Sequence, residues 1–128
     1  MKNKKYLFLF ILVAFSIQTL QAQSRKQKGL LKLAQQEYKY LRFAYAIPVY
    51  KQYLSKQKND TIALLQLGNS YQKVNQYDSA VKYFDLAVAA GVKYNANMAE
   101  AHAMLGHYEK ATLIYKQLID SNKTKIAD

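Results

Sequence analysis

Residues 64–87, LLQLGNSYQKVNQYDSAVKYFDLA, decide the fold of this 128-residue chain. Leu67 and Tyr71 stand four residues apart, a spacing that places both side chains on one face of a helix. After a short polar turn, Ala80 and Phe84 repeat the same spacing. The stretch therefore predicts two short helices joined by a tight turn.

An aromatic–x–x–Ala–x–x–x–aromatic motif extends this pattern over most of the chain. Its three copies are Phe43/Ala46/Tyr50, Tyr77/Ala80/Phe84 and Tyr108/Ala111/Tyr115. The second copy begins 34 residues after the first, and the third begins 31 residues after the second. Repeats of this length, built from two helices, are typical of a helical solenoid, in which neighbours bury faces that one unit cannot bury alone. Such stacks usually bind other proteins.

Six helices are expected from the apolar spacing and the turn residues. They span about residues 29–40, 44–56, 61–74, 78–90, 95–105 and 108–122. Residues 23–28 are polar and basic and are expected to fray. Pro48 is interpreted as a first-turn residue, where its missing N–H costs little. No useful stretch alternates with a period of two, so the expected fold class is all-α.

The stretch 61–94 resembles the tetratricopeptide repeat family. The residues that carry the resemblance are Leu64, Leu67, Gly68, Tyr71, Ala80, Phe84 and Ala87. The third copy has Met98, Ala99 and His102 where the second has Leu67, Gly68 and Tyr71, and the first copy has Leu33, Ala34 and Glu37. The family's tryptophan is replaced by Leu30, Leu64 and Asn95. The resemblance implies a right-handed solenoid of about three repeats, near residues 27–60, 61–94 and 92–125.

The aromatic residues of these repeats are expected to form the core. They are Tyr50, Tyr71, Phe84, Tyr108 and Tyr115. Gly68 and Ala80 are expected where two helices cross closely, because a glycine inside a helix costs about 1 kcal/mol against alanine and needs a packing reason.

The first 22 residues have the order of a secretory signal peptide. Lys2, Lys4 and Lys5 precede an uncharged apolar run over residues 6–17, and a polar segment then ends on Ala22. A retained membrane anchor is the alternative, although the run is shorter than the roughly 20 residues that span a bilayer. No cysteine follows the run, so a lipoprotein is excluded. The expected domain is residues 23–128, exported to the periplasm or cell envelope.

Charge and composition limit the classes of partner. Removal of the three N-terminal lysines leaves 16 basic and 8 acidic residues, a formal charge of +8. Such a balance often accompanies nucleic-acid binding, but export argues against that partner. Because the lysines are scattered, they are expected to form a solvated face, with attraction to anionic envelope polymers or membrane surfaces as the alternative.

No catalytic, cofactor or metal site is predicted. The chain has no cysteine, no Gly-rich phosphate loop and only two histidines. His102 replaces a packing tyrosine and is expected in the core, and His107 is expected in an exposed turn. Neither histidine has the three or four convergent ligands that a metal site needs.

The family resemblance places a partner-binding groove on the concave face, which the first helices of successive repeats line. The candidate groove residues are Gln35, Tyr38, Lys39, Asn69, Gln72, Lys73, Asn97 and Glu100. Their amide-rich mixture suits hydrogen bonding to an extended peptide. The expected function is therefore a protein-interaction scaffold that binds a peptide or protein partner.

The apolar edge at the end of the third repeat is expected to pack against a further element. Only nine residues, 120–128, follow Leu118 and Ile119, and seven of the nine are polar. Either a partner or a second copy caps the apolar edge, or the sequence is the front of a longer protein. The chain resembles the N-terminal repeat region of exported Bacteroidetes envelope proteins of the outer-membrane-protein-A-like family. In those proteins the repeats precede a peptidoglycan-binding domain, and some of the proteins serve secretion or gliding. The resemblance covers the N-terminal segment and the repeats and does not extend to peptidoglycan binding.

Overall fold

The computed structural model describes residues 2–127, and within this range the chain consists of α-helices joined by short turns. Its helices are α1 (Lys2–Lys39), α2 (Phe43–Leu54), α3 (Thr61–Lys73), α4 (Tyr77–Ala89), α5 (Ala96–Met104) and α6 (Tyr108–Ala127). The all-α prediction is confirmed, because residues 2–127 contain no strand.

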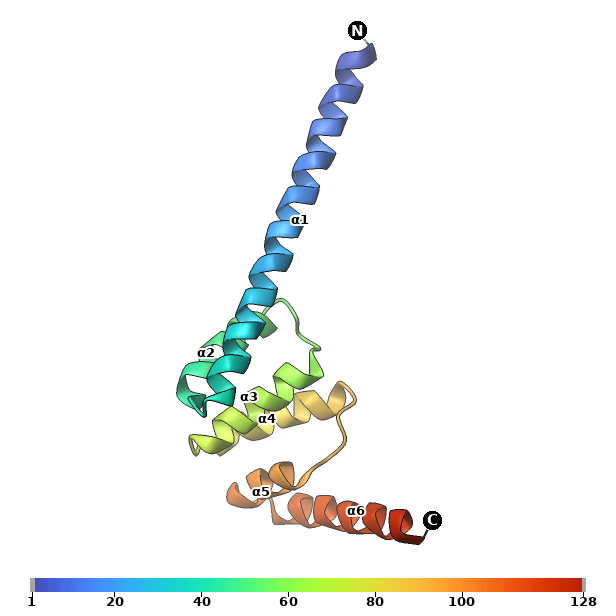
Figure 1. The fold of residues 1–128 in the computed structure, drawn as a ribbon. Coiled ribbons are helices and arrows are strands. Elements are labelled where there is room, and N and C mark those ends of the chain that lie inside the picture. The colour runs from blue at the N-terminus through green and yellow to red at the C-terminus, as the bar shows by residue number, and fades with distance from the viewer. Residues whose placement is uncertain (1, 128) are drawn as a thin grey trace.

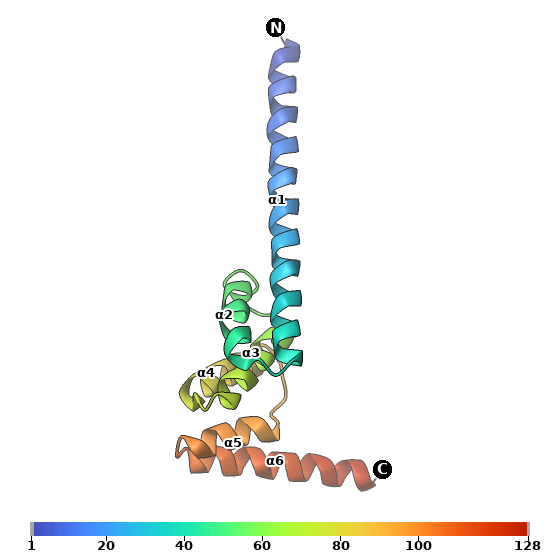
Figure 2. The same cartoon turned by 60° about the vertical axis from the view of Figure 1, so that its left-hand side comes forward.

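The helices form three successive hairpins, α1–α2, α3–α4 and α5–α6 (Figure 1). α2 packs on α3 and α4 packs on α5, so each hairpin contacts the next (Figure 2). The N-terminal half of α1 projects away from these hairpins. The arrangement is that of a helical repeat solenoid, in which stacking completes each unit's core.

Left-handed backbone conformations reverse the chain between helices. Gly91 follows α4 with a φ of 106°, and Gly106 follows α5 with a φ of 78°. Asn75 has a φ of 61° in the α3–α4 turn, and Leu41 has a φ of 59° in the α1–α2 turn. Glycine and asparagine accept this region readily, whereas leucine adopts it at a steric cost. The helices expected over residues 61–74, 78–90 and 95–105 leave Asn75, Gly91 and Gly106 in turns, whereas nothing in the sequence indicated the strained backbone of Leu41.

Small residues lie where the helices of each hairpin cross. Ala46, Ala80 and Ala111 are all buried, with exposed fractions of 0%, 0% and 4%. A Cβ atom at Gly68 would lie 2.5 Å and 2.6 Å from two ring carbons of Phe84. The packing reason predicted for Gly68 and Ala80 is therefore present.

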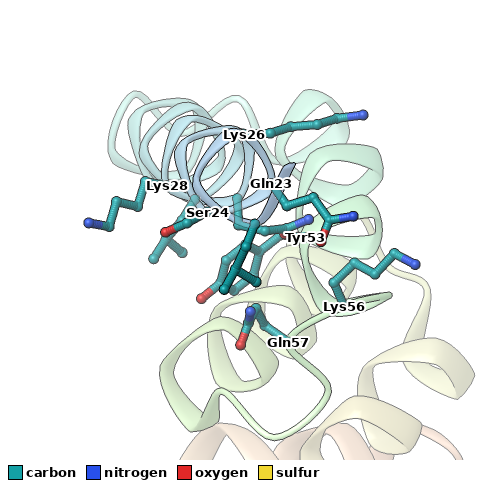
Figure 3. Close-up of a pocket in the computed structure, with 10 residues that line it drawn as sticks. Gln23, Ser24, Lys26, Lys28, Tyr53, Lys56 and Gln57 are labelled. Carbon is teal, nitrogen blue, oxygen red and sulfur yellow. The ribbon is translucent and has the colours of Figure 1, made fainter. Parts of the chain in front are cut away.

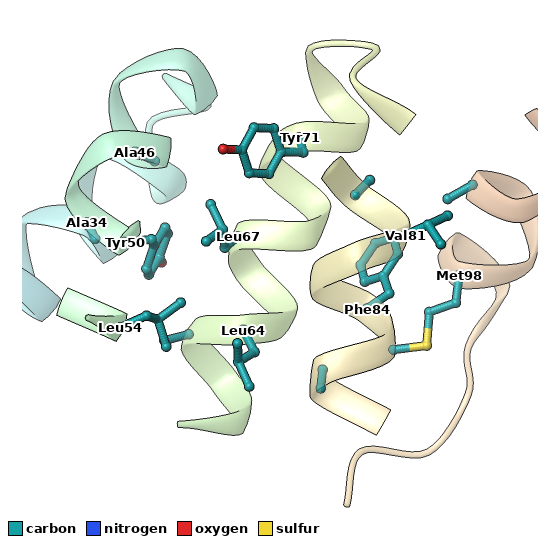
Figure 4. Packing of buried hydrophobic residues seen from close by; sticks show 14 of the residues in the cluster. Ala34, Ala46, Tyr50, Leu54, Leu64, Leu67, Tyr71, Val81, Phe84 and Met98 are labelled. Atoms are coloured by element: carbon teal, nitrogen blue, oxygen red, sulfur yellow. The ribbon is translucent and has the colours of Figure 1, made fainter. Parts of the chain in front are cut away.

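Larger apolar side chains fill the space between hairpins. Figure 4 shows Tyr50 beside Leu67 and Phe84 beside Met98, and all four are fully buried. Tyr71 also belongs to this core and stacks on Tyr83, with ring centroids 5.5 Å apart.

Two aromatic residues predicted to be buried are exposed instead. Tyr108 keeps 69% of its surface exposed and Tyr115 keeps 42%. Tyr50 and Phe84, the counterparts of Tyr115, are covered by the next hairpin, and within residues 2–127 no hairpin follows α6. The position of Tyr108 is only partly buried in the other two copies as well. The burial prediction was therefore wrong for the third copy of the motif.

Three local predictions also need correction. Residues 23–28 do not fray, because α1 continues through them without a break. Pro48 lies in the second turn of α2, which begins at Phe43. Pro48 and Ala44, whose carbonyl loses its helical partner, are both exposed, so water can hydrogen-bond that carbonyl. α6 extends beyond its expected end, to Ala127.

Candidate functional site

A hydrogen-bonded ladder crosses the first helices of the three hairpins. The amide of Asn69 in α3 donates through Nδ2 to the Tyr38 hydroxyl in α1, at 3.3 Å. Asn97 in α5 donates through Nδ2 to Oδ1 of Asn69, at 3.2 Å. The structure therefore brings these three predicted groove residues together on one surface. We call the surface of α1, α3 and α5 to which the sequence assigned the eight groove residues the first-helix face.

A second bond joins α3 to α5 on the same face. Gln72 donates through Nε2 to Oε2 of Glu100, at 3.0 Å. Gln72 is only 8% exposed, so its amide belongs to the contact between repeats. Of the predicted groove residues, Gln72 is the least accessible to a partner.

The other predicted groove residues are exposed. Gln35, Lys39 and Lys73 have no hydrogen bond or ion pair within the described part of the chain. Their donors are therefore unused, and two of the three side chains are cationic. A ligand on this face would therefore meet amide groups that both donate and accept, next to positive charge.

Two residues of this region were missed. Met104 occupies the repeat position of Lys39 and Lys73 and is 57% exposed. Gln66 in α3 accepts a hydrogen bond at its Oε1 from the Tyr50 hydroxyl, at 2.5 Å. Aligning the repeats position by position would have identified Met104, whereas the Gln66 contact needed the packing of α2 on α3.

The two histidines lie together at the C-terminal end of α5. Nδ1 of His102 and Nδ1 of His107 are 3.4 Å apart, and His102 Nε2 lies 3.7 Å from Asp85 Oδ1. Because 3.7 Å is too long for a hydrogen bond, His102 Nε2 is buried without a hydrogen-bond partner in the described residues. Burial lowers the pKa of His102, and Asp85 only partly opposes that shift. His102 is in the core and His107 is exposed, as the sequence predicted.

Residues 2–127 contain no group of three or more His, Cys, Asp or Glu side chains that could hold a metal ion. The geometry of the His102–His107–Asp85 group fits a packed, neutral imidazole.

A separate cavity of about 590 Å³ lies where α1 meets the end of α2 (Figure 3). Lys26, Lys28 and Lys56 line it together with Tyr53. The lysine side chains extend in different directions, so their charges do not converge on one point. This cavity is basic, but its lysines do not form an anion-binding site.

One helix within the described residues is long and apolar enough to cross a membrane. It is the stretch Asn3–Lys39 of α1, whose most apolar 18-residue window has a mean hydropathy of 1.5 and no buried residue. A signal sequence near the N-terminus meets the same criteria of length and composition. The apolar residues of this stretch lie in the part of α1 that projects from the hairpins.

Comparison with known proteins gives a match for the central hairpin. Residues 63–93 match the family model described as tetratricopeptide repeat. No curated protein matches the chain. The matched residues cover nearly all of α3 and α4, and the hairpins before and after repeat their packing. The match and the stacked hairpins together support a tetratricopeptide repeat protein.

Proposed function

We propose that the chain is an exported scaffold that binds a peptide or protein partner on its first-helix face. Tetratricopeptide repeats generally mediate protein–protein interactions and typically form non-catalytic scaffolds. The observation that supports a site on this face is the ladder Tyr38–Asn69–Asn97, which aligns polar groups from three consecutive repeats.

The ladder suits the main chain of an extended peptide. Peptide N–H and C=O groups alternate along such a chain, and an asparagine amide can pair with both. Lys39 and Lys73 occupy equivalent positions of the first two repeats and favour a carboxylate on the same partner. The expected ligand is therefore an extended segment with an acidic residue.

Binding would exchange bonds rather than simply add them. Asn69 already makes two hydrogen bonds within the protein, so a partner gains from it only by replacing one. A typical hydrogen bond contributes about 0.5–1.5 kcal/mol net. Gln35 and Lys73 have no protein partner to give up in the described residues, and they should contribute more than Asn69.

The triple variant Gln35→Ala, Asn69→Ala and Lys73→Ala tests this proposal. It should weaken capture of a partner from envelope extract by about one to three orders of magnitude while the helix content stays unchanged. Capture is measured by pull-down and quantified against the partner so identified, and helicity is measured by circular dichroism.

A matched control removes the same residue types away from this face. The substitutions are Gln52→Ala, Asn59→Ala and Lys58→Ala, all at exposed positions. This variant should bind like wild type. Equal capture by the first triple variant and by wild type would place partner binding elsewhere on the molecule.

A second candidate is a cationic binder of envelope polymers or of a membrane surface. The formal charge of +8 and the exposed lysines around the α1–α2 cavity favour it. Charge-driven binding weakens steeply as salt rises, whereas a hydrogen-bonded peptide groove depends less on salt. A salt titration of the captured complex therefore separates the two candidates.

The cellular setting belongs to the same proposal. The N-terminal order of charged, apolar and small residues supports export to the periplasm. The resemblance to Bacteroidetes envelope proteins supports a role at the front of a peptidoglycan-associated secretion or gliding protein.

A further inference from the structure

The contact between successive hairpins uses the same pair of positions each time. An aromatic side chain of one hairpin's second helix packs on an aliphatic side chain of the next hairpin's first helix. Tyr50 meets Leu67 in the first contact, and Phe84 meets Met98 in the second (Figure 4). All four side chains are at most 1% exposed. This chain therefore forms one kind of interface twice.

At each end of the stack of three hairpins, one of these two positions has no partner within the described residues. Tyr115 holds the position of Tyr50 and Phe84 in the third hairpin, and it is 42% exposed. Leu33 holds the position of Leu67 and Met98 in the first hairpin, and it is 45% exposed. The described residues thus present an unpaired aromatic half at one end and an unpaired aliphatic half at the other.

The surfaces around Tyr115 and Leu33 also lack the packing that equivalent surfaces have inside the stack. Ile119 holds the position of Leu54 and is 56% exposed, whereas Leu54 is 7% exposed. At the other end, Leu33 lines a recess of about 630 Å³. The remaining residues of the recess are Glu37, Arg42, Tyr45, Pro48 and Val49. One end therefore carries projecting apolar side chains, and the other carries a recess whose lining combines apolar side chains with the Glu37–Arg42 ion pair.

We infer that the end face around Tyr115 and Ile119 docks onto the end face around Leu33 of a second copy of this chain. The occupant is a second copy because these faces are the two halves of an interface that the chain already forms between its own repeats. The contact joins different patches, so it is heterologous and extends head to tail. It uses none of the eight predicted groove residues and goes beyond the function proposed above.

Polar groups at the same positions fit this arrangement. Inside the chain, the Tyr50 hydroxyl donates to Gln66 across the first contact. The equivalent positions in the stack are Tyr115 and Lys32 of the next copy. Lys32 is exposed, and its ammonium group can donate to the Tyr115 hydroxyl. The stack therefore keeps a polar pair beside the apolar one.

Two single substitutions test the inference, because each blocks one end only. Leu33→Asp puts a negative charge on the end face that carries the aliphatic position, and Tyr115→Asp puts one on the end face that carries the aromatic position. The matched control is Leu86→Asp, since Leu86 is 46% exposed and lies outside both end faces. The segment from Gln23 onward can be used, because every residue of the apolar core lies between Ala34 and Ile114.

Sedimentation measured from micromolar to millimolar concentration should give a distinct result for each protein. Wild type and Leu86→Asp should grow in mass as concentration rises. Leu33→Asp alone and Tyr115→Asp alone should stay monomeric. An equal mixture of these two should form dimers and nothing larger, because each retains the half that the other has lost. Circular dichroism checks that every variant keeps its helices.

Two results would overturn the inference. Wild type that stays monomeric over the whole range would show that a second copy is not the occupant, and that another segment or protein covers the face. Leu33→Asp that still associates like wild type would show a symmetric contact between like ends. The groove triple variant should stack like wild type, so failure of the stack and failure of the groove remain distinguishable. Added salt should strengthen stacking, because it screens the repulsion between cationic copies.

Discussion

At the scale of single residues, steric fit between helices decides which small residues this chain needs. Gly68 lies under the Phe84 ring, where even a methyl group has no space. Gly29, in contrast, has no atom within 4 Å of a Cβ built on it. The two helical glycines therefore differ in their role, because only Gly68 lies where two helices touch.

Gly68→Ala should destabilise the protein by about 1–3 kcal/mol, because the new methyl group would displace the buried Phe84 ring. That loss outweighs the helix-propensity gain of about 1 kcal/mol. Gly29→Ala is the matched control and should leave stability unchanged or raise it by up to about 1 kcal/mol. Urea unfolding of both variants measures the difference. An increase in stability for Gly68→Ala would contradict the close α3–α4 packing.

At the scale of elements, the contact between α4 and α5 contains a titratable group. His102 takes the position at which the second repeat has Tyr71, and it is 4% exposed. Asp85 from α4, together with His107 and Lys110, faces its ring. Because burial is the largest influence, the pKa of His102 lies below its usual value of 6.5.

The stability of the folded chain should therefore fall in mildly acidic solution. Above pH 6.5, His102 is neutral both in the folded and in the unfolded chain. As the pH falls below that value, the unfolded chain binds a proton that folded His102 resists, so the free energy of unfolding decreases until the lower folded pKa is passed. Melting temperatures over this range should show the decrease in wild type and a smaller one in His102→Gln. Identical slopes in both proteins would contradict the prediction.

At the scale of the whole molecule, α1 combines two unlike halves. Its residues from Leu30 onward pack against α2 as the first helix of a repeat, and the large apolar residues from Tyr6 to Leu20 are exposed. An exposed apolar helix of this length is unfavourable in water. Removal during export, or a membrane, would resolve that cost.

Export predicts that the protein recovered from the periplasmic fraction begins near Gln23. The small Ala22 would precede the cleaved bond, and mass spectrometry of the intact protein measures the new N-terminus. Leu12→Arg places a charge in the centre of the apolar run, so this variant should keep its full length and stay in the cytoplasm. Recovery of residues 1–22 on wild-type protein in the membrane fraction would contradict cleavage.

The sequence by itself determined the repeat architecture. Helix spacing, small residues at crossings and glycines at turns act within a few residues of one another, so their consequences can be read from the order of amino acids. The helices expected for α2 to α5, the roles of Gly68 and Ala80, and the contrast between His102 and His107 all follow from such local rules. Tyr38, Asn69 and Asn97, in contrast, were placed on one face by the resemblance to the tetratricopeptide repeat family and not by a local rule.

Only the tertiary structure decided what each residue contacts. Tyr50, Phe84 and Tyr115 share one motif, yet the first two are covered by a following hairpin and the third is not. Gln72 was expected to face a partner, but it bonds to Glu100 across the repeat boundary. Burial and side-chain hydrogen bonding depend on residues that are distant in sequence. A local motif therefore cannot indicate whether those residues are present.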